Sequence, residues 1–209
     1  MRITLEGEQF LLLKERAAIW EDQKTLLIAD LHIGKVSHFR KNGIPVPSMA
    51  ETNNLWRLAD ILLTHKPEKV IFLGDLFHSK LNTSWVDFVD FMDGFRDTTF
   101  ILVKGNHDIL SDRTFEDAGL KVVDEYKVGP FLFSHDATET ELYNIHGHIH
   151  PGVGLKGAGR QRLSLPCFYF GQDTGIFPSF GDFTGLHKIK PLKTDRIYVS
   201  TPDAVVQVQ

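Results

Sequence analysis

The sequence predicts an α/β (α+β) fold in which strands alternate with helices in the first half and a second, mostly antiparallel sheet follows. Apolar, β-branched runs at 24–29, 70–73 and 100–103 are typical of buried strands, and helical periodicity precedes the later two. Strands that alternate with helices form right-handed parallel crossovers, so these runs are expected to be parallel. After residue 120 the apolar runs become short and turn residues separate them, which favours the second sheet.

One globular domain over residues 1–209 is expected, because 42% of the residues are hydrophobic, 24% are charged, and no linker or repeat divides them. No apolar run approaches the roughly 18 residues of a membrane span, and residues 1–6 lack a signal-peptide core, so we expect no membrane contact and a cytoplasmic location. The single cysteine, Cys167, fits a reducing compartment, and its apolar neighbours favour a packed thiol. The net charge of −4 gives no overall attraction to nucleic acid, although it is compatible with a local basic patch.

The first elements are strands. Residues 3–5 and 10–13 predict a strand pair with its turn at Gly7. The buried strand at 24–29 follows, and the prolines within 44–47 then favour an extended loop. These elements place a polar, basic stretch between the first buried strand and the first helix.

Helices and strands alternate in the next part. Ser48 has capping-box spacing and predicts a helix that ends near His65. A strand at 70–73, a helix from about Ser84 and a strand at 100–103 follow in turn. The later strands are predicted at Val122–Val123, Phe131–Phe133, Tyr143–Ile145, Leu165–Phe170, Ile197–Ser200 and Ala204–Val208.

Polar side chains capable of binding metal follow five apolar runs. They are Asp30, His32, Asp75, Asn106, His135, His148 and His150. Ligands bind at strand ends in open α/β sheets. Residues i and i+2 of an extended backbone point the same way about 7 Å apart, so Asp30 with His32, and His148 with His150, can each aim two groups into one pocket.

The donor atoms indicate which ions would bind. Imidazole nitrogen with carboxylate and amide oxygen, and no thiolate, suits manganese, iron or zinc rather than a structural zinc–thiolate site. Seven ligands suit two ions that share a carboxylate, and two ions about 3.5–4 Å apart stabilise in-line displacement at phosphorus. Two divalent ions against the carboxylates of Asp30 and Asp75 leave a surplus of about two positive charges, which favours a phosphate substrate.

The motifs resemble those of the calcineurin-like metallophosphoesterase superfamily, whose pattern runs D-x-H, GD, GNH[DE], H and GHxH. Here they are Asp30-Leu31-His32, Gly74-Asp75, Gly105-Asn106-His107-Asp108, His135 and Gly147-His148-Ile149-His150. The resemblance implies a four-layer α/β/β/α sandwich with a dinuclear site. It assigns Asp30, His32, Asp75 and His150 to one ion, and Asp75, Asn106, His135 and His148 to the other. It also implies that His107 faces the scissile phosphate and assists the leaving oxygen.

One position differs from many members of the superfamily. An acidic residue three positions after the GD aspartate often orients the GNH histidine, and this chain has His78 there. The sequence GDLFH resembles the motif of the double-strand-break repair nucleases, in which two histidines share this task. Either His78 or Asp108 is therefore expected to orient His107, and the alternative is that His78 has no catalytic weight.

A narrower resemblance covers most of the chain. Residues 30–35, 38–40, 43–47, 146–152 and 160–168 are similar to the ligase-associated DNA damage response endonucleases of bacteria. That family implies a manganese-dependent phosphodiesterase that acts on DNA with an ATP-dependent ligase, a helicase and an exonuclease-like protein. The basic residues Arg40, Arg160 and Arg162 could then bind backbone phosphates, the alternative being a solvated surface.

These observations predict a metal-dependent phosphodiesterase, specifically a DNA endonuclease of DNA repair. The first alternative is a phosphodiesterase or phosphomonoesterase that acts on small nucleotide-like phosphoesters, since its site chemistry would be the same. The second is a non-catalytic scaffold on this fold, which the complete set of motifs disfavours. No oligomeric state follows from the sequence.

Overall fold

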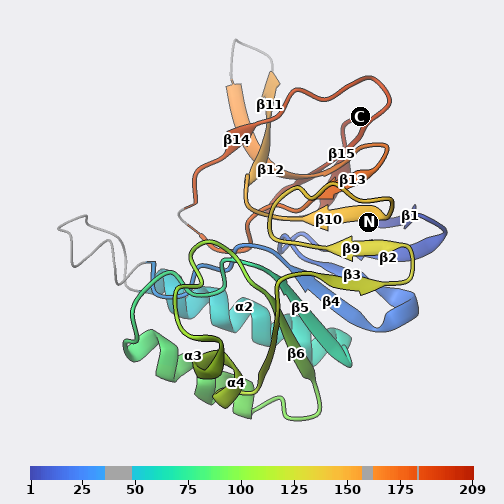
Figure 1. The fold of residues 1–209 in the computed structure, drawn as a ribbon. Coiled ribbons are helices and arrows are strands. Elements are labelled where there is room, and N and C mark those ends of the chain that lie inside the picture. The colour runs from blue at the N-terminus through green and yellow to red at the C-terminus, as the bar shows by residue number, and fades with distance from the viewer. Residues whose placement is uncertain (36–48, 157–161, 183) are drawn as a thin grey trace.

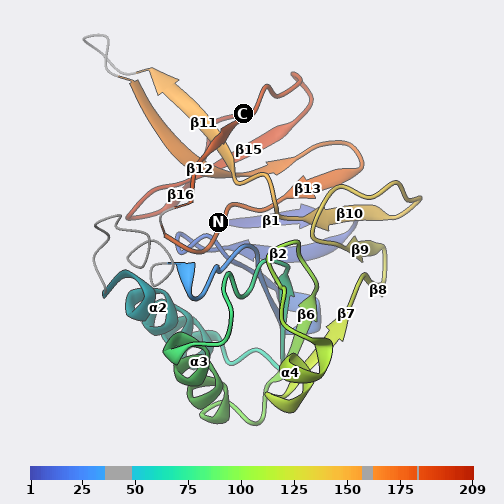
Figure 2. The ribbon, with the colours of Figure 1, turned by 60° about the vertical axis from the view of Figure 1, so that its left-hand side comes forward.

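Two β-sheets lie against each other at the centre of the structure, and helices cover the outer face of the first (Figures 1 and 2). The computed structural model describes residues 1–35, 49–156, 162–182 and 184–209, without the side chains of 49–52, 156 and 162. The mixed α/β class and the two sheets of the predicted four-layer sandwich are confirmed. Among the described residues, all three α-helices precede residue 118, and the second sheet receives no helix.

The first sheet has seven strands in sequential order. They are β1 (Arg2–Leu5), β2 (Glu8–Leu12), β3 (Ala18–Trp20), β4 (Thr25–Ile28), β5 (Lys69–Leu73), β6 (Thr99–Val103) and β7 (Leu120–Val123). Strands β1 to β4 pair antiparallel, and β4 to β7 pair parallel. The predicted parallel arrangement of the three buried strands is thus confirmed.

The helices supply the crossovers between the parallel strands. They are α2 (Met49–His65), α3 (Thr83–Asp93) and α4 (Asp112–Asp117), and a short 3-10 helix, η1, covers Glu21–Gln23. The first two match the predicted helices, although Ser48, the predicted cap, lies outside the described residues. Helix α4 was not predicted, because six residues are too few to show a periodic pattern. It connects β6 to β7 and thereby places Val122–Val123 in the first sheet rather than the second, which corrects the prediction.

The second sheet has nine strands and mixed pairing. They are β8 (Tyr126–Val128), β9 (Phe131–Phe133), β10 (Tyr143–His146), β11 (Pro151–Lys156), β12 (Arg162–Phe170), β13 (Thr174–Ile176), β14 (His187–Lys188), β15 (Arg196–Ser200) and β16 (Val205–Gln207). Antiparallel pairs are in the majority, as predicted, but β10 pairs parallel with both β9 and β13, and β11 pairs parallel with β14. The parallel pair of β9 and β10 matters for the site, because it directs two strand ends to the same edge.

The strands of the first sheet contribute to two hydrophobic cores. Leu26 and Ile28 of β4 belong to the core beneath the helices, whereas Leu27 and Ala29 belong to the core between the sheets. Successive residues of a strand point to opposite faces, so a continuous apolar run serves both cores. The buried thiol of Cys167 lies in a smaller cluster, and burial raises its pKa to about 12, which agrees with the predicted packed thiol.

The helix faces toward the first sheet are apolar, as the periodicity predicted. Leu58 and Ile61 of α2 and Phe88 of α3 are buried in the core beneath the helices.

In the described part of the chain, none of the helices combines the length and apolar character that a membrane crossing requires.

Candidate metal centre

The predicted metal ligands lie just beyond strand ends in both sheets. Asp30 and Asp75 each lie two residues past the ends of β4 and β5, which are parallel neighbours. His135 and His148 each lie two residues past the ends of β9 and β10, which are also parallel neighbours. Because the carboxyl ends of parallel strands share an edge, each sheet delivers its polar side chains to one place.

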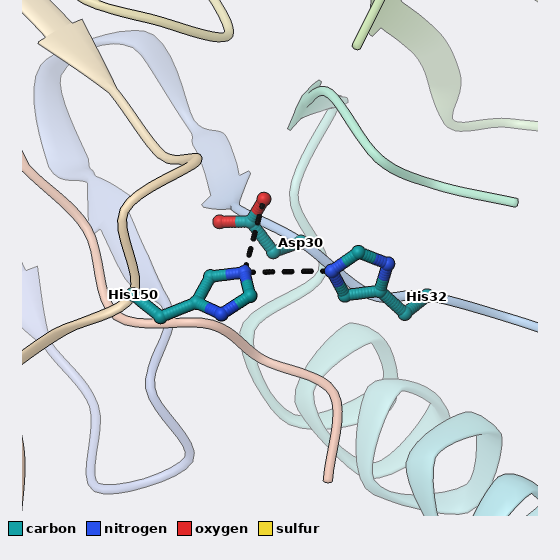
Figure 3. A group of neighbouring side chains, drawn as sticks. All are labelled: Asp30, His32 and His150. Atoms are coloured by element: carbon teal, nitrogen blue, oxygen red, sulfur yellow. Dashed lines mark hydrogen bonds and ion pairs between the residues drawn. The ribbon is translucent and has the colours of Figure 1, made fainter. Parts of the chain in front are cut away.

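Six side chains form two groups at this edge. The first is Asp30, His32 and His150, and the second is Asp75, His135 and His148. Within each group, the potential ligand atoms lie within 4.8 Å of one another. Figure 3 shows the first group, in which His150 Nε2 lies 3.4 Å from His32 Nε2 and 3.6 Å from Asp30 Oδ1. The structure therefore brings together six of the seven side chains that the sequence predicts as ligands.

Asp75 lies between the two groups. Its Oδ1 atom is 3.4 Å from His135 Nε2 in the second group, and its Oδ2 atom is 3.8 Å from His32 Nε2 in the first. The residue is 2% exposed, so neither oxygen is solvated freely. A carboxylate with one oxygen toward each group is suited to two ions held side by side.

The donor atoms of both groups fit divalent metal ions. Burial lowers the pKa of His32, which keeps its ring neutral, the form that binds metals. His135 Nδ1 lies 3.1 Å from the carbonyl oxygen of Leu73, so a proton on Nδ1 donates to that oxygen and leaves the Nε2 lone pair toward the group. Ring nitrogens and carboxylate oxygens without thiolate suit manganese, iron or zinc.

The ligand backbones are left-handed rather than extended, which corrects the reasoning from extended strands. Asp30, His32, Asp75, His148 and His150 have φ of 53°, 51°, 51°, 68° and 50°. They are five of the nine non-glycine residues with positive φ in the described ranges. Such a backbone costs about 1–3 kcal/mol for each residue and is typical of functional sites. The strands end before the ligands, and the left-handed turns set the side-chain directions.

Three motif glycines make room for ligands from other motifs. A Cβ atom on Gly147 would lie 2.6 Å from Asp30 Oδ2, and one on Gly105 would lie 2.5 Å from Asp75 Oδ1. A Cβ atom on Gly74, whose φ is +76°, would collide with the ring of His135. The glycine in the GNHD motif therefore serves close packing against Asp75 as well as its own turn.

The GNHD turn lies against the second group. The backbone N–H of His107 donates to Asp75 Oδ1 at 2.9 Å. Both Asn106 and His107 are exposed, at a position that a substrate can reach. Asn106 is the residue directly before His107, and metal binding by Asn106 stays a prediction.

His78 and Asp108 have different relationships to His107. The ring centroids of His78 and His107 are 4.0 Å apart, with an interplanar angle of 44°. Asp108 is buried, and its two oxygens accept from the backbone N–H of Phe77 at 2.9 Å and of Gly105 at 2.8 Å. Burial raises the pKa of Asp108 to about 6, although both hydrogen bonds oppose that shift. Asp108 thus ties the loop after β5 to the GNHD turn, and His78 contacts the His107 ring.

Asp136 is a neighbour of the site that the sequence analysis missed. Its Oδ2 atom lies 3.9 Å from His148 Nε2, and its place directly after His135 was the available signal. Asp136 also lines a cavity of about 460 Å³ with His146, Ile149 and Thr174. A cavity of this volume is typical of small-molecule sites.

The three predicted phosphate-binding arginines cannot be placed at the site. Arg40 and Arg160 lie outside the described residues. Arg162 begins β12, but its side chain is also outside what the structure describes. Their contact with a substrate therefore stays a prediction.

Comparisons with known proteins agree with this geometry. The family model "Calcineurin-like phosphoesterase" matches residues 23–183. The solved nuclease MPE of Pseudomonas putida is 28% identical, with a TM-score of 0.84 over 100% of this chain and 99% of that chain. No curated protein sequence matches.

Two further solved structures are similar at lower scores. AQ665 from Aquifex aeolicus, described as a protein of unknown function, is 23% identical, with a TM-score of 0.43 over 60% of this chain and 78% of that chain. The phosphoesterase Yfce from E. coli is 10% identical, with a TM-score of 0.44 over 88% of this chain and 97% of that chain. Because the family model covers more than half of the chain, this protein belongs to the calcineurin-like phosphoesterase family and is a metal-dependent phosphoesterase.

Proposed function

We propose that this protein is a dinuclear metal-dependent phosphodiesterase that acts as a DNA endonuclease. The position of Asp75 carries the proposal, since one carboxylate with an oxygen toward each group suits a pair of adjacent ions. The likeness to a nuclease of P. putida, at 28% identity over 100% of this chain, supports DNA as the substrate. A phosphodiester is also the group that a paired-metal site stabilises well during in-line displacement.

The ligands divide between the two ions around Asp75. One ion would be held by Asp30, His32, Asp75 and His150, and the other by Asp75, Asn106, His135 and His148. Manganese is the expected metal, and iron and zinc are the alternatives that the same donor atoms accept. When bound, such ions polarise the phosphate and lower the pKa of a water molecule.

The GNHD turn and His78 supply the remaining catalytic groups. His107 is fixed through its backbone N–H to Asp75, and its ring donates a proton to the leaving oxygen or stabilises it. His78 orients that ring through the contact described above. Asp108 holds the loop that carries His78 against the turn that carries His107.

The wider setting follows the resemblance in the sequence. Residues 1–209 form one domain that acts in the cytoplasm, in DNA repair, together with an ATP-dependent ligase and a helicase. Arg40, Arg160 and Arg162 bind phosphates that flank the scissile one, because guanidinium groups pair with phosphate through two hydrogen bonds.

The decisive experiment compares substrates with manganese present. Single-stranded and double-stranded DNA, closed circles included, are incubated beside bis(nitrophenyl) phosphate and nitrophenyl phosphate. We expect cleavage of a circular DNA and of the diester, with Asp117→Asn, an exposed carboxylate, as an active control. Hydrolysis of the monoester alone would overturn the nuclease assignment.

The second candidate is hydrolysis of small nucleotide-like phosphoesters. The cavity of about 460 Å³ favours it, because Asp136 connects that cavity to His148 and a nucleoside could occupy it. Hydrolysis of cyclic or dinucleotide diesters with no cleavage of long DNA would select this function.

A further inference from the structure

A segment outside every motif lies along the first metal-binding turn. The hydroxyl group of Ser179 and the backbone N–H of Gly181 both donate to the carbonyl oxygen of Asp30, at 2.8 Å and 3.0 Å. The backbone N–H of Phe180 donates to the carbonyl oxygen of Ala29 at 2.8 Å. We name residues 179–182 the 179–182 segment, and its first three residues therefore hydrogen-bond to the backbone of Ala29 and Asp30.

Asp30 needs such support because of its backbone. Its φ of 53° lies in the left-handed region, which a non-glycine residue rarely occupies. Its N–H donates to the carbonyl oxygen of Gly74 at 3.2 Å, and its carboxylate accepts from the N–H of His148 at 3.0 Å. The carbonyl group of Asp30 accepts its hydrogen bonds from the 179–182 segment. This segment therefore helps to fix the backbone of Asp30, which sets the direction of its carboxylate.

Two arginines hold the 179–182 segment in turn. The guanidinium of Arg57, on α2, lies 4.3 Å from the ring centroid of Phe180 and donates to the carbonyl oxygen of Phe180. Its Nη1 atom is 3.5 Å from Asp182 Oδ1. Arg16, in the loop between β2 and β3, pairs with the same Asp182 oxygen at 2.5 Å. The segment is thus clamped to the first sheet and to α2 simultaneously.

We propose that the 179–182 segment, held by Arg57 and Arg16, positions Asp30 for metal binding and sets the affinity of the first group for its ion. The inference rests on the proposed function, because it requires Asp30 to be a metal ligand. Arg57 and Arg16 act as positioning residues, since both contact the segment and neither is among the predicted ligands.

The contact at Gly181 allows a sharp test. A Cβ atom on Gly181 would lie 2.5 Å from the carbonyl oxygen of Leu31 and 3.1 Å from that of Asp30. A Cβ atom on Gly185, four residues later, would have no neighbouring atom within 4 Å. Gly181→Ala should therefore push the segment off the Asp30 turn, and Gly185→Ala is the matched control.

The experiment is calorimetric titration of the metal-free full chain with Mn²⁺. We expect Gly181→Ala to lower the Mn²⁺ affinity of one of the two sites by about 10–100-fold, because loss of a group that supports a metal ligand typically has an effect of this size. The affinity of the other site should stay within about twofold of the wild-type value. Arg57→Met should do the same, with Arg113→Met, whose side chain is 88% exposed, as its control. At saturating Mn²⁺, kcat should return to near the wild-type value.

The outcomes separate the inference from the proposed function. If the wild type binds neither Mn²⁺ nor Fe²⁺ nor Zn²⁺, the proposed function fails. If the wild type binds two ions and both variants bind them equally well, or lose both sites alike, the positioning role is wrong. Should Gly181→Ala fail to fold, Ser179→Ala removes one hydroxyl group without adding bulk, and the same selective loss of one site is expected.

Discussion

The ring of His78 lies 4.0 Å from the ring of His107, measured between their centroids. The ring of His78 also lies 5.2 Å from the ring of His32, so His78 lies between the first group of predicted ligands and the GNHD turn. Asp108, the other residue expected to orient His107, instead accepts two backbone hydrogen bonds. His78 therefore lies beside the ring of His107, whereas Asp108 holds the backbone of Phe77 and of Gly105.

Replacing His107 should abolish turnover while metal binding persists. The side chain is exposed, and its interaction with Asp75 is through the backbone, which alanine retains. We expect His107→Ala to lower kcat about 10²–10⁴-fold, the range of general acid catalysis. Elemental analysis should still find two ions per chain. His65→Ala, at the exposed end of α2, is the control, and wild-type turnover in His107→Ala would refute the assignment.

Replacing His78 should have a smaller effect than replacing His107. We expect His78→Ala to lower kcat about tenfold, since His107 is retained but its ring is less well oriented. The chain should still bind two ions, because His78 is not among the predicted metal ligands. Steady-state kinetics and elemental analysis beside His187→Ala, an exposed histidine on β14, measure both quantities. An unchanged kcat would leave His78 without a catalytic role.

Removing the metal ions should destabilise the fold. The site gathers the carboxylates of Asp30 and Asp75 in a buried place, and bound ions favour the folded state by mass action. At about 100-fold excess over Kd one ion contributes roughly 2.7 kcal/mol. For a chain of this size that corresponds to a fall in Tm of roughly 5–10 °C on chelation. Thermal unfolding with and without a chelator measures it.

Asp75→Asn is the natural comparison for that experiment. Loss of the shared carboxylate should remove metal and activity together, so chelation should change its Tm little. If Asp75→Asn bound two ions and stayed chelator-sensitive, Asp75 would not be shared between the two groups.

Removing the Asp108 carboxylate should loosen the junction between two loops. Asp108→Ala would leave the backbone N–H groups of Phe77 and Gly105 without their acceptors, at a cost of about 1–3 kcal/mol for each buried donor. Chemical denaturation should show a loss of about 2–6 kcal/mol in the free energy of unfolding, and kcat should fall as well. Asp117→Ala, on the exposed face of α4, should change neither the free energy of unfolding nor kcat. If Asp108→Ala were as stable as the wild type, Asp108 would not hold the two loops together.

The sequence predicted the fold and the gathering of side chains because both depend on local patterns. Apolar runs such as 70–73 mark strands, and a polar residue after each run lies at the shared edge. The left-handed backbone of Asp30 and His32 gave no such signal, since neither residue is glycine. Arg57 was missed for another reason. Its partners Phe180 and Asp182 lie more than 120 residues away in the chain, a relationship that no periodicity reveals.

The motif glycines limit how this site could be rebuilt elsewhere. A side chain at Gly147 would collide with Asp30, one at Gly105 would collide with Asp75, and one at Gly74 would collide with His135. A designer who grafts one turn onto another scaffold would therefore transfer a glycine without the side chain it accommodates. The smallest transplantable unit is the set of turns from both sheets together, so loop-by-loop exchange should fail even when every motif is copied faithfully.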